Sequence, residues 1–415
     1  MTAARTFAAT RNVRLLYAYQ ACMQLQPHVA IWVVYLTAFR ELTLAQVGTL
    51  EAFFWGVSIV AEVPTGAFSD RYGRRVTFLV ASVIEGIGIL AFALGSSYPL
   101  LLLSYVLWSL GLAFGSGNAS AFLYDSFAAA GRAADFVRHQ GRLSAIGRGA
   151  FLGGAIAGGL LAGASTTQVV VFIAVVPYLF AIAVATRMTD PPRTRADEHS
   201  AASYGGALAR ALLVLRQDAA IRWVILVTVS LDALLVADWL LMQPYFESHA
   251  IPLALFGVLA APVRLAGIGA ALLAHRYVAL IGFRRGLGAM IVAITAGVAA
   301  IGLIDHRASF AGYFLLSGGL GLIDPAIMGY LNDRVPQAVR ATVLSVPPLG
   351  ASIAFAIMGG AAGILADASL RLALVALAAT VFTIAGGAYV LWLRADAAAP
   401  PSPAGHATAI RAPRG

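Results

Sequence analysis

Two ionisable side chains lie deep within consecutive apolar runs in the second half of the chain. Asp232 is about eleven residues into one run and Arg264 about twelve into the next, which places each roughly 16 Å deep in a helix. A charge near the centre of a bilayer costs about 2.5–3.5 kcal/mol, so such a residue is a functional candidate with a partner. Because consecutive spans are antiparallel, we expect Asp232 and Arg264 to pair at a central cavity, in coupling or substrate binding. A static pair between helices is the alternative.

Further polar residues are candidates for the same cavity. Asp238 lies about 120° around the helix from Asp232 and should face another neighbour or the outer vestibule. Asp324 precedes a proline, which frees a backbone carbonyl and allows a moving kink. Gln20, Gln24 and His28 of the first apolar run are spaced by four residues and should share one face of a helix that points to the cavity. Asn118 of the fourth run is a further polar candidate for the cavity lining. His28 is more often a hydrogen-bonded core histidine than a proton carrier.

The elements that position these residues are membrane helices. Of the 415 residues, 60% are hydrophobic and 11% charged, whereas soluble domains carry roughly 25% charged residues. Apolar runs of about 20 residues each suffice to cross a membrane, and their backbone groups must be satisfied within a helix. We therefore predict an all-α integral membrane protein with spans at about 14–37, 44–66, 76–95, 99–124, 138–162, 168–187, 221–246, 252–275, 286–304, 309–330, 341–366 and 371–393.

Arginines determine the predicted orientation. The net charge is +9, and the arginines gather in alternate short connections and at both termini, a pattern typical of cytoplasmic loops and not of nucleic-acid binding. Both termini should then be cytoplasmic. The predicted domains are an N-terminal arm (1–13), a six-helix bundle (14–187), a cytoplasmic linker with an interfacial helix (188–220), a second six-helix bundle (221–394) and a disordered tail (395–415).

The densest charge in the first half is Gly66-Ala67-Phe68-Ser69-Asp70-Arg71-Tyr72-Gly73-Arg74-Arg75, between spans two and three. Four ionised groups within six residues exclude a place in hydrocarbon, so we predict a tight cytoplasmic turn. The stretch resembles the signature loop of the major facilitator superfamily, and the six-plus-six division of spans agrees with that family. Glu62-Val63-Pro64-Thr65 and Arg340-Ala341-Thr342 resemble a bacterial, drug-efflux-like subgroup, which implies the inner (plasma) membrane.

The resemblance implies two pseudo-symmetric bundles, alternating access and a latch on the cytoplasmic side. Asp70 would meet the N-terminus of span eleven near Arg340, where exposed N–H groups favour an anion. The arginines would pair with acids such as Asp125, and the glycines would permit close approach. The alternative is that the arginines only anchor the orientation. The gating set is Gly66, Asp70, Arg71, Gly73, Arg74, Arg75, Asp125, Glu62 and Arg340.

Several functions remain open from the sequence. Export of a small amphipathic organic compound is the first hypothesis, and uptake of a metabolite with protons as the coupling ion is the second. The resemblance implies two antiporter features that this chain lacks. The glycine-rich motif of span five, here Gly154–Gly159, has no proline, and 108–118 in span four holds no cation where many antiporters carry an arginine tied to proton coupling. Uptake therefore stays open beside export. Lipid handling is a third hypothesis. An enzyme would need a clustered set of catalytic residues, but the seven histidines are scattered along the chain and there is one cysteine. We therefore expect that the protein is not an enzyme and has neither a metal site nor a cofactor. The expected partners are the small-molecule substrate and the lipid bilayer, with no nucleic acid, and the protein should be a monomer.

Overall fold

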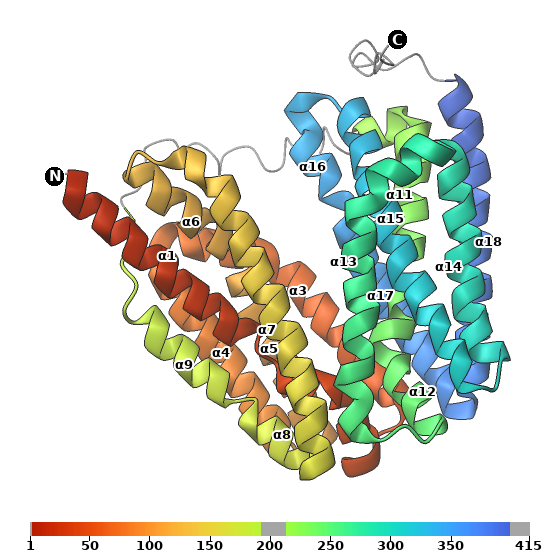
Figure 1. The fold of residues 1–415 in the computed structure, drawn as a ribbon, viewed down its shortest axis with the longest axis horizontal. Coiled ribbons are helices and arrows are strands. Elements are labelled where there is room, and N and C mark those ends of the chain that lie inside the picture. Colours follow the sequence, from red (N-terminus) through yellow and green to blue (C-terminus); the bar gives the residue numbers. More distant parts are fainter. Residues whose placement is uncertain (1, 192–212, 399–415) are drawn as a thin grey trace, which may run out of the picture. The chain divides into compact units, whose positions relative to one another are not determined.

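The computed structural model describes residues 2–191 and 213–398, and in these residues the chain is helical throughout its regular structure (Figure 1). Eleven helical segments there are long and apolar enough to cross a membrane. The predicted interfacial helix of the linker lies mostly outside the described residues, as does the predicted tail beyond residue 398. The described chain divides into two compact units. Unit 1 comprises 2–191, 242–261 and 359–367, and unit 2 comprises 213–241, 262–358 and 368–398.

The first half of the chain supplies most of unit 1. Its helices are α1 (Thr2–Gln24), η1 (Pro27–Ala30), α2 (Trp32–Val34), η2 (Tyr35–Phe39), α3 (Leu44–Tyr72), α4 (Arg74–Leu94), α5 (Tyr98–Gly115), α6 (Asn118–Ala129), η3 (Ala133–Asp135), α7 (Phe136–Ala164), α8 (Thr167–Ile173) and α9 (Val176–Ala185).

The second half of the chain is helical too and begins with a span made of three helical pieces. Its helices are α11 (Ala219–Asp232), η6 (Ala237–Leu241), α12 (Met242–Ser248), η7 (Leu253–Leu255), α13 (Phe256–Ile281), α14 (Phe283–Leu303), η8 (Arg307–Phe310), α15 (Ala311–Arg334), η9 (Gln337–Val339), α16 (Arg340–Leu344), α17 (Val346–Ala368) and α18 (Leu370–Ala398). Because α18 continues to Ala398, the predicted start of the tail at 395 is too early.

The predicted first span, 14–37, is interrupted. Helix α1 ends at Gln24, and a 3-10 turn, a short α-helix and a π-helix (η2) follow. Pro27 explains the interruption, because it has no N–H to donate and its ring clashes with the preceding turn of a helix. This predicted span is therefore the one that has no counterpart among the eleven segments of the described chain.

Glycines bring the helices of unit 1 close together. A Cβ added to Gly88 of α4 would lie 2.8 Å from the backbone nitrogen of Trp108 in α5, and one added to Gly111 would lie 2.8 Å from that of Glu85. Around these contacts aromatic rings form the core, among them His28, Phe92 and Tyr105, which are all fully buried or nearly so. Such close packing leaves little room for water beside the helices.

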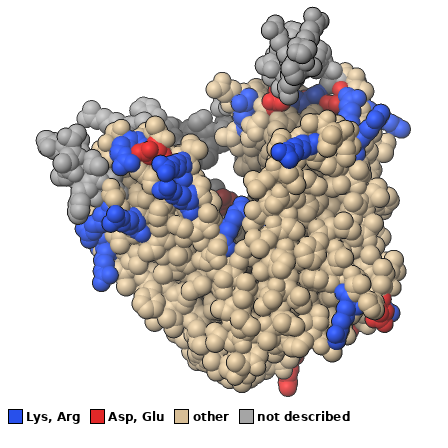
Figure 2. Space-filling model, viewed as in Figure 1, with Lys and Arg blue, Asp and Glu red and all other residues tan. Residues whose placement is uncertain are grey.

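Unit 2 packs α14 against α15 and α18, and α11 against α15 and α18. Gly297 of α14 permits the first approach, since a Cβ there would lie 3.1 Å from the carbonyl oxygen of Gly312. Figure 2 shows arginine side chains gathered mainly near one end of each unit, with broad uncharged surface beyond them. A surface of this kind suits contact with lipid.

Candidate functional site

Span seven loses its regular α-helical form where it carries its acidic residues. Helix α11 ends at Asp232, a turn follows, and Ala237–Leu241 forms the π-helix η6. π-helical segments are rare and are often found at functional sites. Asp238 and Trp239 lie within this segment, so the irregular backbone directs both side chains.

Asp238 forms an ion pair with Arg264 of α13. The Nη2 atom of Arg264 lies 3.3 Å from Oδ2 of Asp238, and the side chains are 22% and 15% exposed. The guanidinium also lies over the ring of Trp239, 5.7 Å from its centroid, within the range of a cation–π interaction. The other carboxylate oxygen, Oδ1, is buried without a hydrogen-bond partner among the described residues. It is therefore an acceptor available to water or to a ligand.

The predicted pair of Arg264 with Asp232 is wrong. Asp238 lies about ten residues before Ser248, and Arg264 about eleven after Leu253, so both are roughly 15–17 Å from the connection between their spans. Asp232 lies about one and a half turns further along. The break after α11 and the π-helix change the orientation of the later side chains, which regular 3.6-residue periodicity does not anticipate.

Asp232 instead lies near Asp324. Asp324 belongs to α15, directly before Pro325 within that helix, and is close enough for its charge to act on Asp232. Both side chains are half-buried. Within the described part of the chain, neither carboxylate forms an ion pair with a cation. Two carboxylates that share a poorly solvated place disfavour double ionisation, so this pair is suited to hold a proton or an organic cation.

The signature stretch has a different backbone from the predicted turn. Helix α3 continues through Tyr72 and α4 begins at Arg74, so the change of direction is confined to Gly73, whose φ of 95° favours glycine. Asp190, which we did not predict, lies against this point. Its Oδ1 accepts a hydrogen bond of 2.8 Å from the backbone N–H of Arg75. The carboxylate thus caps the N-terminus of α4.

Three arginines of the stretch have separate contacts. Arg74 donates from Nε to Oδ2 of Asp125 at 2.8 Å, as predicted. Arg75 donates from Nη2 to the carbonyl of Thr186. The guanidinium of Arg71 lies over the ring of Tyr72, 5.5 Å from its centroid.

Asn118 belongs to the same cluster and not to a cavity. It is buried, its Nδ2 donates to the carbonyl of Arg74 at 3.0 Å, and its Oδ1 accepts from Ser69 at 3.0 Å. The predicted cavity role of Asn118 is therefore wrong. It fastens α6 to the turn between α3 and α4.

The remaining gating candidates lie at the surface. Gly66, Glu62 and Asp70 are exposed on α3, and no ion pair joins either acid to another described residue. Arg340, the first residue of α16, donates to the carbonyl of Val335. The predicted meeting of Asp70 with this helix would join the two units, and it stays a prediction.

Polar residues of span one do not share one face. Gln20 and Gln24 point toward α7, where a Cβ on Gly147 would lie 2.8 Å from Nε2 of Gln20. His28 is fully buried and its ring lies 5.1 Å from that of Trp108 in an edge-to-face arrangement. The prediction that His28 shares a helix face with Gln20 and Gln24 is wrong. Helix α1 ends at Gln24, so the four residues between Gln24 and His28 do not form a regular helical turn.

Gln243 was not predicted, although it holds the interrupted span one. Its Oε1 accepts from the N–H groups of Val33 and Val34 at 2.9 and 3.3 Å, and its Nε2 donates to the carbonyl of Val29 at 3.0 Å. These bonds satisfy backbone groups that the break leaves without helical partners. The sequence does not indicate this role, because Gln243 is a single uncharged side chain within an apolar run.

A second cluster without a sequence signal stabilises one end of unit 2. Asp396 of α18 accepts from Arg284 at 2.7 Å, from Arg334 at 3.1 Å and from Tyr330 at 2.7 Å. Arg334 also pairs with Asp218, which caps the N-terminus of α11. The cluster therefore joins α11, α14, α15 and α18.

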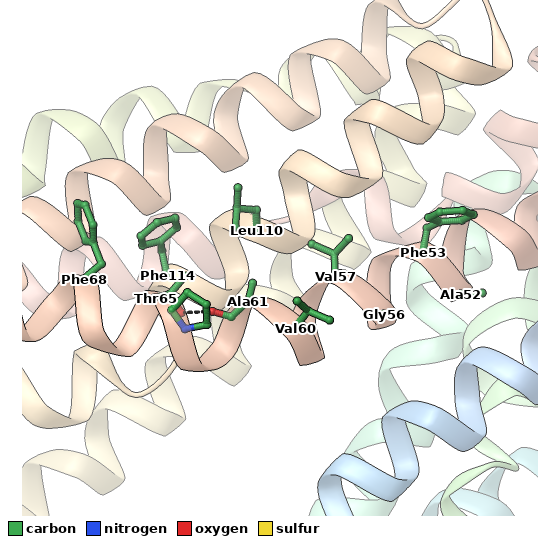
Figure 3. Close-up of a pocket in the computed structure, with 11 residues that line it drawn as sticks. Ala52, Phe53, Gly56, Val57, Val60, Ala61, Thr65, Phe68, Leu110 and Phe114 are labelled. Atoms are coloured by element: carbon green, nitrogen blue, oxygen red, sulfur yellow. Dashed lines mark hydrogen bonds between the residues drawn. The ribbon is translucent and has the colours of Figure 1, made fainter. Parts of the chain in front are cut away.

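An apolar pocket of about 870 Å³ lies along α3 and α5 of unit 1. Figure 3 shows Phe53, Val60 and Phe68 along one wall and Leu110 and Phe114 on the other. None of its lining residues is charged. Lipid tails cover such a surface without cost, so the pocket alone does not identify a substrate.

A family model described as Major Facilitator Superfamily matches residues 28–346. No curated protein sequence matches the chain significantly. A mutant of the nucleoside transporter NupG has a TM-score of 0.74 at 13% identity, covering 94% of this chain and 99% of that one. A bacterial homolog of the human lysosomal transporter Spinster, inward-facing and unoccupied, has a TM-score of 0.72 at 16% identity, covering 96% and 99%.

A third solved structure, the POT family transporter PepTSo, has a TM-score of 0.64 at 15% identity, covering 93% of this chain and 97% of that one. At such identities the likeness shows the fold and carries no information on cargo.

Proposed function

The chain belongs to the major facilitator superfamily, and from this premise we propose a secondary active transporter that moves a small amphipathic organic compound by alternating access. The observation that carries the coupling mechanism is the pair of Asp232 and Asp324. Each is half-buried in a span, and neither pairs with a cation among the described residues. Protonation removes the repulsion between them, so a proton gradient can drive their loading and release.

Substrate would bind beside this pair, at the Asp238–Arg264–Trp239 group. The free Oδ1 of Asp238 offers an acceptor, and Trp239 offers an aromatic surface. A mixed aromatic and polar lining suits a compound with an apolar body and one donor group better than phosphate or a metal ion. The Asp70 latch would act at another place, on the rate of the conformational change.

Export across the inner membrane is the direction we propose, with both termini in the cytoplasm. The efflux-like sequence around Glu62 supports export, and the basic turns support the orientation. Proton-driven uptake is the second candidate. It is favoured by the absence of a cation in 108–118, because the resemblance implies an arginine there in many antiporters of the superfamily.

Transport into membrane vesicles of both orientations tests direction and coupling together. The probes would be ethidium, a neutral nucleoside and a dipeptide, each measured with an imposed pH gradient and without one. Export predicts proton-driven accumulation of ethidium in inside-out vesicles only. Accumulation in right-side-out vesicles would establish uptake. Movement of all three probes without response to the gradient would refute coupling, and movement of none would refute the substrate class.

A further inference from the structure

The last turn of α17 lies on the first turn of α3, within unit 1. Asp367 accepts two hydrogen bonds from α3, at 2.6 Å from the backbone N–H of Leu44 to Oδ1 and at 3.1 Å from that of Ala45 to Oδ2. These N–H groups begin a helix and have no partner within it. The carboxylate of one span therefore caps the N-terminus of another.

The two helices meet here through backbone and not through interlocking side chains. A Cβ on Gly48 of α3 would lie 2.6 Å from the carbonyl oxygen of Gly359, and one on Gly363 would overlap the carbonyl of Leu44. Residues 359–367 accordingly group with unit 1, while the rest of α17 groups with unit 2. Small residues on both helices therefore allow this close approach of the two backbones.

Helix α3 also has a cap of its own. Thr43 accepts from the N–H of Gln46 at 3.2 Å, and the Gln46 side chain accepts from the N–H of Thr43 at 3.0 Å. This capping box stays with α3 when Asp367 leaves. Asp367 is exposed, so water can replace it at the two freed N–H groups. Release of Asp367 would therefore leave the start of α3 capped.

We propose that Asp367 is a gating residue, which clasps the end of α17 onto the start of α3 and is released when that end of the transporter opens. Helix α3 carries Asp70 at its other end, with the sequence-predicted partner at the start of span eleven. The antiparallel helices α3 and α17 would then have one carboxylate cap at each end, used in alternation. The inference rests on the proposed alternating access.

Spin labels at Glu41 and Ala368, both exposed and both next to the clasp, report its opening. With Cys22 replaced by serine, pulsed electron–electron distance measurements give the populations of short and long separations. Asp367→Asn should increase the long-distance population about two- to fivefold, as expected for loss of an anion at a helix N-terminus. Asp367→Ala, which also removes both acceptor oxygens, should give a larger increase than Asp367→Asn.

Asp70→Asn should decrease the population of long distances between the same labels, because it weakens the proposed latch at the opposite end of α3 from Asp367. Asp305→Asn is the matched control, because it neutralises an exposed acid that pairs with Arg371 and not with α3. Unchanged distances in Asp367→Asn, or a shift of both variants in one direction, would overturn the clasp. Vesicle transport distinguishes the two proposals: distances that respond as expected in a chain that transports nothing would refute the transport function and leave the clasp standing.

Discussion

In unit 2 two acidic residues inside one span stand at irregular backbone and are half-buried. Asp232 ends α11, and Asp238 lies in a π-helix. In unit 1 two acids inside the spans, Glu51 and Glu85, stand in regular helices and are only 3% and 2% exposed. A group that takes up and releases protons or substrate needs a path to them. The comparison therefore supports the proposed coupling role of Asp232 in unit 2 and predicts a scaffold role for Glu51 and Glu85 of unit 1.

The surroundings of Glu85 show how closed that part of unit 1 is. The hydroxyl of Tyr178 lies beside its carboxyl, and Gly111 of α5 lies against its backbone. Glu85 is therefore a packed polar residue of the core.

Neutralising Asp232 should have the largest effect. Asp232→Asn keeps the size of the side chain but cannot release a proton, so we expect transport driven by the pH gradient to fall more than about tenfold, which corresponds to more than about 1.4 kcal/mol. Proton-driven probe accumulation in vesicles measures this, with Asp305→Asn as the control. Undiminished accumulation with normal insertion would remove coupling from unit 2.

Arg264→Gln should be the next most harmful change. It leaves the carboxylate of Asp238 without its cation in a partly buried place, at a cost of about 1–3 kcal/mol. The double variant Arg264→Gln with Asp238→Asn should regain most of the lost stability but not transport. Thermal unfolding in detergent gives the stability, and vesicle uptake gives the activity. Full activity in the double variant would make the pair a static helix contact.

The sequence predicts the helices well and the long-range contacts poorly, for physical reasons. Apolar length alone identifies the spans, and opposite charge near a turn suffices to pair Arg74 with Asp125. Regular periodicity fails where the helix itself is irregular, as at His28 and Asp238. The roles of Gln243 and Asp190 depend on residues more than 100 positions away in the chain, and no local pattern encodes such distant partners.

Glu85→Gln should change transport less than twofold. A glutamine has nearly the same shape and is always neutral, so it replaces a carboxyl that serves only packing. Glu85→Ala, in contrast, leaves a cavity between α4 and α5 and should destabilise the protein by about 1–3 kcal/mol. The same vesicle assay and thermal unfolding separate the two effects. Loss of the pH response in Glu85→Gln would show that unit 1 also carries a coupling group.

His28→Phe should have the smallest effect on activity and a favourable one on stability. Both ring nitrogens of His28 are buried without a hydrogen-bond partner among the described residues, and an unsatisfied polar group costs about 1–3 kcal/mol. A phenyl ring can keep the edge-to-face contact with Trp108 without that cost, so the midpoint of thermal unfolding should rise while transport stays within twofold. A lower midpoint of thermal unfolding together with a loss of proton coupling would mean that His28 binds water or a proton in this core. Unit 1 would then take part in coupling and would not serve only as a scaffold.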